Sequence, residues 1–151
     1  MRLHLVTLGS VVLAAAISAP ATGAPQSERV IRVTATSISG STQKKPPAGP
    51  AGDVIVGSDR LRNAVAQFGK PKGAVVGKDT YRLVFRSAHV AAISVTATLP
   101  GGTIRCQGTF DDRRRSQLIR VVGGTGSFAG VTGTCEARPS GSATLNTYRL
   151  R

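Results

Sequence analysis

The chain has 151 residues, with two cysteines, two histidines and no tryptophan, and its lysines and arginines exceed its acids by 13. This length allows one domain. Beyond residue 21 the only histidine is His89, and no Gly-x-Ser-x-Gly motif is present, so neither a clustered metal site nor a hydrolytic triad is expected. We also expect no cofactor.

The positive charge is spread along the chain. Without Arg2, 19 basic residues stand against 7 acids, a charge of +12. This charge predicts either a solvated basic exterior or attraction to an anionic polymer. Few aromatic residues lie among the cations to stack on bases, so we expect no specific binding of nucleic acid.

The N-terminus has the pattern of a secretory signal. Arg2 and His4 precede an apolar run over residues 5–17, which is too short to span a bilayer. Ala19-Pro20-Ala21 has the form of a signal-peptidase site, so we expect residues 1–21 to be removed, by cleavage after Ala21 or after Ala24. The alternative is a retained membrane anchor. The first interpretation predicts a secreted protein that does not insert into membranes after cleavage.

The rest of the chain is typical of an all-β domain. Residues 29–38 are rich in β-branched side chains and predict a first strand, and residues 40–52 are a Gly/Pro/Lys loop. Short strands with turns about every ten residues then indicate a barrel or sandwich. We expect them at 53–57, 60–66, 74–86, 90–99, 103–110, 116–123, 131–138 and 143–150, with some of the first three merged.

Alternation of side chains indicates which strand faces are buried. Tyr81, Leu83 and Phe85 share one face, and similar apolar faces run through 91–99 and 104–110. Residues 118–122 are apolar on both faces, which predicts either contacts between subunits or a monomer with an apolar outer face. The run 111–115, Asp-Asp-Arg-Arg-Arg, predicts either a hairpin tip of solvated charges or a clamp for an anionic ligand.

A glycine-rich run over residues 121–135 predicts a tight corner between two strands, with Phe128 as a hydrophobic plug. Its glycines are Gly123, Gly124, Gly126, Gly130 and Gly133. Gly124-x-Gly126-x-x-Ala129 also fits a dinucleotide fingerprint. That fingerprint needs a following helix and a second strand, but only 22 residues follow Ala129, so we exclude it.

The two cysteines, Cys106 and Cys135, leave two alternatives open. Both lie in the part of the chain expected to be exported, where oxidation to a disulfide is the default. If the strand at 116–123 lies between them, their backbones are roughly 9 to 10 Å apart, beyond the roughly 7 Å that a disulfide tolerates. The sequence therefore does not decide between a bridge and free thiols.

The corner Val-Gly-Gly-Thr-Gly-x-Phe-x-Gly over residues 122–130 resembles the signature of the allene oxide cyclase and dirigent superfamily. Gly52-Asp53, the run 58–61, the run 69–73 and the run 102–108 look like further landmarks of that family, in the same order. The resemblance implies an eight-stranded antiparallel up-and-down β-barrel over residues 29–151. It also implies an apolar lumen for a small hydrophobic ligand and a homo-oligomer, commonly a trimer.

The functional residues of the family transfer poorly to this chain. Dirigent proteins carry an acid on the first strand, which residues 29–38 lack, and another before the glycine corner, where Leu118 stands here. The arginine that often follows the corner is Thr132 here, and the acid and proline of allene oxide cyclases have no match in 29–38. The family's catalytic residues are therefore not evident, and the sequence does not decide whether the protein is an enzyme.

Two residues remain as catalytic candidates, Asp59 and Arg120. Asp59 precedes a strand near the barrel, where burial would raise its pKa into the range for general acid-base work, although it also suits a β-turn. Arg120 faces the lumen if Leu118 does, and would then pair with a ligand carboxylate or enolate. The candidate ligand-binding residues are Tyr81, Phe85, Leu118 and Arg120.

We therefore expect a secreted barrel that binds a small hydrophobic molecule and guides a stereoselective cyclisation, isomerisation or coupling by holding it in one conformation. The alternatives are a non-catalytic extracellular carrier and a basic module that binds anionic cell-surface polymer. Salt separates them, because binding of a polyanion weakens steeply as the salt concentration rises and lumenal binding of an apolar ligand does not.

Overall fold

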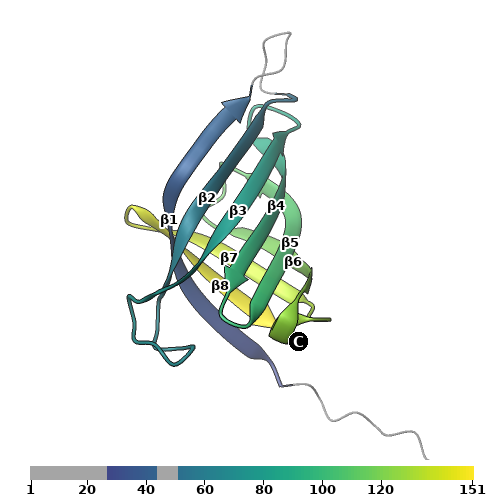
Figure 1. The fold of residues 1–151 in the computed structure, drawn as a ribbon. Helices are drawn as coiled ribbons and strands as arrows, with labels where there is room; N and C mark the ends of the chain where they lie inside the picture. Colours follow the sequence, from purple (N-terminus) through teal and green to yellow (C-terminus); the bar gives the residue numbers. More distant parts are fainter. Residues whose placement is uncertain (1–26, 44–50) are drawn as a thin grey trace, which may run out of the picture.

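The computed structural model of the protein describes residues 27–43 and 51–151, and shows eight antiparallel strands closed into a barrel in chain order (Figure 1). The expected signal at 1–21 and residues 44–50 of the expected loop lie outside the described residues. The strands are β1 (Arg29–Gln43), β2 (Val54–Asn63), β3 (Val75–Phe85), β4 (Val90–Leu99), β5 (Gly102–Asp111), β6 (Gln117–Gly124), β7 (Gly133–Ser140) and β8 (Ala143–Leu150). The predicted up-and-down barrel is therefore confirmed.

Two features of the strand bounds decide how the barrel wall is built: an open alternative is settled in β2, and β1 is longer than expected. The segments expected at 53–57 and 60–66 form one continuous strand, β2, because Ser58 and Asp59 pair with both neighbouring strands instead of turning. Strand β1 extends to Gln43, so part of the expected loop is paired with β2 through residues 39–43. The long β1 and β2 place Asp59 in the middle of the barrel wall.

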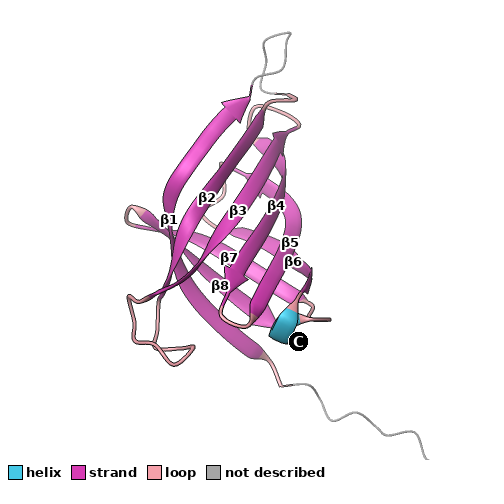
Figure 2. Cartoon of the chain, viewed as in Figure 1, coloured by secondary structure: helices cyan, strands magenta, loops and turns pink. Residues whose placement is uncertain are grey.

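The two ends of the barrel are built differently. One end carries both described chain termini and a single 3-10 turn, η1 (Gly126–Phe128), and we call it the closed end (Figure 2). The other end carries the β3–β4, β5–β6 and β7–β8 connections, and we call it the mouth. All eight strands contribute buried apolar side chains to one core cluster, which also contains Phe128 with an exposed fraction of 0%.

The glycine corner lets η1 fold back under the barrel. Gly126 has φ 61°, in the region that favours glycine, and at Gly124 a side chain would meet the backbone of Thr103 and Phe128. The Arg29 guanidinium lies 4.7 Å from the centroid of the Phe128 ring, a cation–π contact that covers it. The glycine-rich segment therefore turns the chain between β6 and β7 and carries the buried Phe128.

The β2–β3 connection at the closed end is held by one buried side chain, Asn63. Its Nδ2 atom donates to the backbone oxygens of Gln67 (2.8 Å), Lys70 (3.0 Å) and Pro71 (3.3 Å). The same three oxygens also accept backbone N–H groups, so the Asn63 amide adds a second donor to each of them and fixes the loop to the end of β2.

Asn63→Ala is therefore expected to lower the free energy of unfolding by about 2–3 kcal/mol, since the loop loses three hydrogen bonds of roughly 1 kcal/mol each. Urea unfolding and limited proteolysis within residues 64–73 measure the effect. As a control, Gln67→Ala removes a half-buried side chain of the same loop, whose amide makes two hydrogen bonds with the Arg32 backbone, and should cost less than the three bonds of Asn63. Equal costs would contradict the role assigned to Asn63.

None of the helical segments in the described part of the chain is long and apolar enough to cross a membrane.

Candidate functional site

The mouth half of the barrel encloses a cavity of about 290 Å³. Its wall is mainly apolar on β4, β6 and β7, and polar on β2, β3 and β8. The lining residues are Asp59, Asp79, Tyr81, Ile93, Val95, Phe110, Asp112, Arg114, Arg115, Ser116, Gln117, Ile119, Cys135, Ala137, Pro139, Thr144, Asn146 and Tyr148. Its size is near the lower limit for small-molecule sites, and a few polar groups in an apolar cavity are typical of such sites.

Two carboxylates lie directly opposite each other on the cavity wall. Asp59 of β2 and Asp79 of β3 are cross-strand partners, and both line the cavity. Residues in such positions have Cβ atoms roughly 4.5–5.5 Å apart, so the two carboxyl groups interact strongly. Asp79 is 3% exposed, and its Oδ1 atom has no hydrogen-bond partner among the described residues.

The pKa of Asp79 is raised to about 7, first by burial and then by the negative charge of Asp59, while a hydrogen bond with the Asp59 backbone lowers it. Burial also raises the pKa of Asp59. Two like charges at this separation resist simultaneous ionisation, so the pair retains a proton up to nearly neutral pH. We call these two residues the carboxyl pair.

Two tyrosines flank the carboxyl pair. Tyr81 lies one step further toward the mouth on β3, with its ring against Gly57, a position where a side chain would collide with the ring. The pKa of Tyr81 is raised, first by burial and then by the charges of Asp59 and Asp79. Tyr148 of β8 is 0% exposed, and its hydroxyl has no partner among the described residues. Both hydroxyls remain protonated donors at neutral pH.

The cysteines lie deeper, beneath the cavity. Cys135 lines its floor and pairs across the strands with Tyr148. Its pKa is raised well above the ordinary value by a hydrogen bond with the Cys106 thiol, and further by burial. Both cysteines are free in this structure, so the bridge that the sequence left open is not formed. Strand β6 lies between their strands, as the geometric objection required.

We expect both thiols to stay reduced and protected in the folded protein. Ellman's reagent should titrate close to two thiols per chain after unfolding in denaturant and almost none before it, because both side chains are buried. A protein that shows no reactive thiol even when unfolded without reductant would instead be bridged. A matched sample unfolded with reductant gives the full count.

The mouth is lined by charged residues of the β5–β6 connection. Arg113 donates to both Asp111 oxygens, at 2.8 and 2.9 Å, and this hydrogen bonding lowers the pKa of Asp111 to about 2. His89 Nδ1 lies 3.0 Å from an Asp112 oxygen. Arg114 and Arg115 line the cavity, whereas Arg113 does not. The cavity therefore has an apolar body and a rim of both charges.

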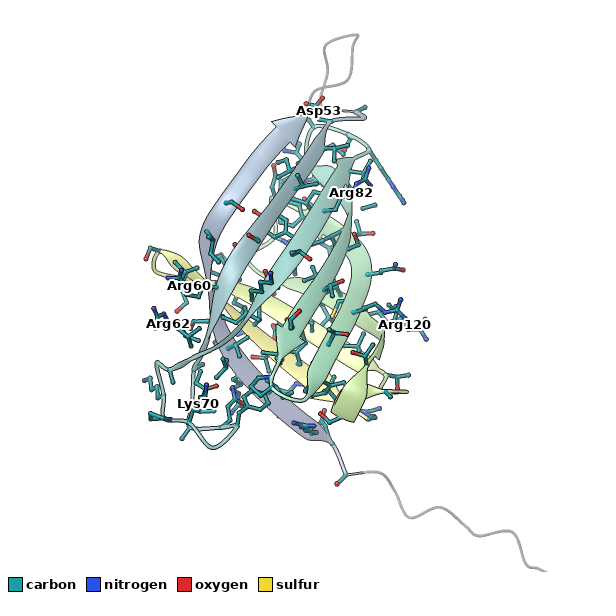
Figure 3. The ribbon with its side chains drawn as sticks, viewed as in Figure 1. Asp53, Arg60, Arg62, Lys70, Arg82 and Arg120 are labelled. Atoms are coloured by element: carbon teal, nitrogen blue, oxygen red, sulfur yellow. The ribbon has the colours of Figure 1, made fainter. Side chains whose placement is uncertain are left out.

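The expected ligand-binding residues separate into two groups. Tyr81 lies on the cavity wall, and Phe85, further along β3, is partly buried but does not line the cavity. Leu118 is 67% exposed, and Arg120 is exposed on the outer face of β6 (Figure 3). The expected phase of this strand is wrong, because Ile119 and Val121 face inward. A lumenal role for Arg120 is therefore excluded.

The catalytic candidate Asp59 lies on the cavity wall within a strand, and not in a β-turn. Its cross-strand partner Asp79 was not among the predicted site residues. The alternation of the strand did indicate that Asp79 faces inward. It lies an even number of residues from Tyr81, Leu83 and Phe85, and therefore on the face predicted to be buried. Asn146 and Tyr148 share the inward parity of β8 in the same way. No group of three metal-ligating side chains occurs in the part of the chain that the structure describes.

Fold and site define an antiparallel β-barrel with an open cavity that contains a carboxyl pair. The family model "Dirigent-like protein" matches residues 21–150, and the chain belongs to the dirigent-like family. This confirms the resemblance seen in the glycine corner. Among curated proteins, none matches the sequence significantly.

Solved structures share the barrel at low sequence identity. A pyocyanin demethylase has a TM-score of 0.66 and 18% identity, over 82% of this chain and 100% of its own. The exo-specific intermolecular Diels-Alderase AbnU has a TM-score of 0.63 and 15% identity, over 83% of this chain and 98% of its own. A pterocarpan synthase dirigent protein has a TM-score of 0.60 and 16% identity, over 88% of this chain and 92% of its own. At these identities the similarity establishes the fold alone.

Proposed function

We propose that the protein is a secreted barrel that binds a small, mainly apolar molecule in its cavity and guides a cyclisation, isomerisation or coupling of that molecule. The observation that carries this proposal is the carboxyl pair of Asp59 and Asp79 on the wall of an otherwise largely apolar cavity. Asp79 is buried and Asp59 is partly buried, and two opposed acids in such positions destabilise a fold unless they share a proton.

The carboxyl pair suits proton transfer without net consumption of protons. Protonated Asp79 donates to a carbonyl or enolate oxygen of the ligand, while ionised Asp59 accepts a proton from a hydroxyl or an acidic C–H of the same molecule. The buried hydroxyls of Tyr81 and Tyr148 donate hydrogen bonds that fix its orientation. An enzyme of this kind lowers its barrier mainly by holding the ligand in one reactive conformation.

The structural neighbours support this class of chemistry. Two of them are named as a Diels-Alderase and a pterocarpan synthase. A third is named as a demethylase. The members of this fold thus differ in reaction, and the substrate of this chain follows from its own cavity, whose 290 Å³ admit a molecule of about one or two fused rings.

Binding in the cavity is tested with N-phenyl-1-naphthylamine, a neutral apolar dye that brightens in apolar surroundings. We expect the protein to bind it, with an affinity that hardly changes between low and high salt. Ala137→Phe places a ring in the cavity and should weaken dye binding at least tenfold. Val122→Phe adds the same ring on the outer face of β6 and serves as the control.

A protein that binds the dye equally with Ala137→Phe would exclude the cavity as the site. A thermal unfolding curve of each variant shows whether the barrel remains folded, so that loss of binding and loss of fold are separated.

A further inference from the structure

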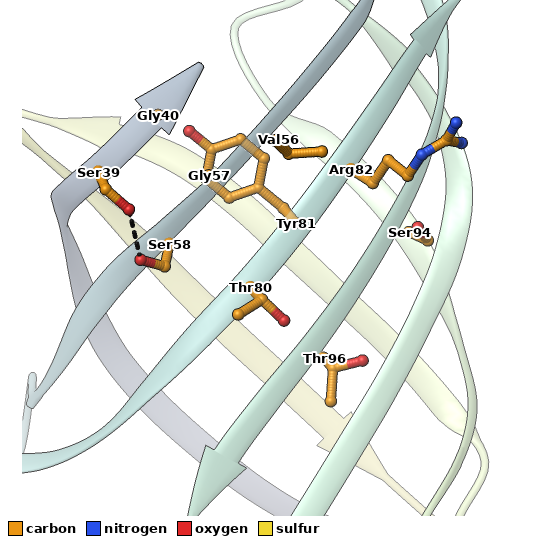
Figure 4. Close-up of a pocket in the computed structure, with 10 residues that line it drawn as sticks. All are labelled: Ser39, Gly40, Val56, Gly57, Ser58, Thr80, Tyr81, Arg82, Ser94 and Thr96. Atoms are coloured by element: carbon orange, nitrogen blue, oxygen red, sulfur yellow. Dashed lines mark hydrogen bonds between the residues drawn. The ribbon is translucent and has the colours of Figure 1, made fainter. Parts of the chain in front are cut away.

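A shallow groove crosses the outside of the barrel wall, and it shares only Tyr81 and Ile93 with the lining of the cavity. It consists of two adjoining hollows of about 550 and 530 Å³, which share Arg82 and Ser94. The first extends over β2 and β1 to Ser58 and Ser39, whose hydroxyls are 2.9 Å apart (Figure 4). The second extends over β5 to Arg120 on β6. We call the two hollows together the outer groove.

The strand register aligns the polar groups of the outer groove in one row. Arg82 pairs with Ser94, Ser94 with Gln107, and Gln107 with Arg120, so these four residues run straight across β3, β4, β5 and β6. Three strand spacings of about 4.8 Å separate the two arginine backbones by roughly 14–15 Å. Hydrogen-bonding side chains therefore fill the interval between two cations.

The cations of the outer groove are free of ion pairs. Within residues 27–43 and 51–151, no acid is paired with Arg82, Arg86 or Arg120, and none lines either hollow. Arg113 and Arg138, outside the groove, are paired with Asp111 and Glu136. Figure 3 shows Arg82 and Arg120 on the outside of the barrel wall.

We propose that the outer groove binds an anionic polysaccharide, with its negative groups on Arg82 and Arg120 and its hydroxyls on Ser94 and Gln107. Guanidinium groups suit carboxylate and sulfate, and the row of hydroxyl and amide groups suits a chain of sugar hydroxyls. The separation of the arginines requires a ligand of several sugar units, not a single anion.

Two other occupants fit the outer groove less well. Nucleic acid binding without a sequence preference relies on aromatic rings that stack on bases, and the one aromatic residue lining the groove, Tyr81, lies with its ring against Gly57 and also lines the cavity. A second copy of this chain carries a net charge of +13 and would bring repulsion to a groove without acids. Both remain outcomes of the experiment.

The experiment measures the affinity of the full-length protein for fluorescent dextran sulfate of about 5 kDa, with neutral dextran of the same length as a negative probe. Arg82→Gln combined with Arg120→Gln should weaken binding at least tenfold. Arg32→Gln combined with Arg60→Gln removes the same charge from exposed positions outside the groove and should weaken it less than threefold. Glucose 6-sulfate should compete only at concentrations far above those of the polymer.

Equal losses in the two double variants would overturn the proposal, because binding would then follow net charge. Tighter binding of single-stranded DNA than of dextran sulfate, with the same dependence on Arg82 and Arg120, would also overturn the proposal. The ligand of the outer groove would then be a nucleic acid and not a polysaccharide. A neutral dextran that binds equally, or a dimer that dissociates only in the groove variant, would also overturn it. Binding of N-phenyl-1-naphthylamine in the cavity should be unchanged in both double variants, which keeps the outer groove and the cavity distinguishable.

Discussion

Asp79→Asn is expected to remove a pH dependence of stability that the natural protein shows between pH 5 and pH 8. Burial and the charge of Asp59 raise the pKa of Asp79 to about 7, from 3.8. The folded state therefore holds this proton more tightly than the unfolded state does. Ionising Asp79 opposes folding, so its effect is absent below pH 3.8, grows as the pH rises toward 7, and is complete above pH 7.

The expected size of this effect follows from the shift in pKa. Relative to Asp79→Asn, the natural protein should lose about 2–3 kcal/mol of unfolding free energy between pH 5 and pH 8, at about 1.4 kcal/mol for each unit of pH below 7. Urea unfolding of both proteins at several pH values measures it. Asp59→Asn should also reduce the dependence, because the charge of Asp59 contributes to the raised pKa of Asp79.

Asp112→Asn is the matched control for this experiment. Asp112 is an exposed acid at the mouth, in contact with His89, and its replacement should leave the loss of stability above pH 5 in place. Parallel curves for the natural protein and Asp79→Asn would contradict the shared proton and would remove the chemical basis of the proposed function.

Phe128→Ala is expected to cost about 3–5 kcal/mol of unfolding free energy. The ring is 0% exposed in the core at the closed end, and it lies in a turn held by tightly packed glycine backbone that cannot collapse into the space left behind. The truncation also removes the ring that contacts the Arg29 guanidinium. Urea or thermal unfolding measures the loss.

Phe110→Ala provides the comparison for Phe128. Phe110 is only partly buried and lines the cavity, so its removal enlarges an existing space and should cost clearly less. Equal losses for the two variants would show that Phe128 is not the plug of the closed end.

Short strands with turns about every ten residues predicted a barrel or a sandwich, and the resemblance of the glycine corner to a known family favoured the barrel. Strand β4 was predicted at its observed bounds, and the glycine corner was placed with Phe128 inside it. The merger of two segments into β2 was left open, because Gly57-Ser58-Asp59 resembles a turn locally and becomes a strand only when β1 and β3 pair with it. Such pairing is a tertiary effect that local propensity does not contain.

The candidate site was predicted only in part, and strand phase explains the difference. Residues 118–122 are apolar on both faces, so alternation could not decide which of Leu118 and Ile119 faces inward. The observed phase depends on a register irregularity between Arg105 and Cys106 that no sequence pattern marked. Asp79 was not predicted as a site residue, although it lies on the strand face that was predicted to be buried. An acid on an apolar face is recognised as functional only when its cross-strand partner is known.

The proposal that the cavity holds a small molecule is tested most directly by native mass spectrometry of the protein purified from its natural source. If a small molecule occupies the cavity, we expect a discrete additional mass of a few hundred daltons per chain. This mass should be retained at high salt and lost in Ala137→Phe. A bare chain mass in the natural protein, unchanged by Ala137→Phe and accompanied by no binding of apolar dyes, would contradict it.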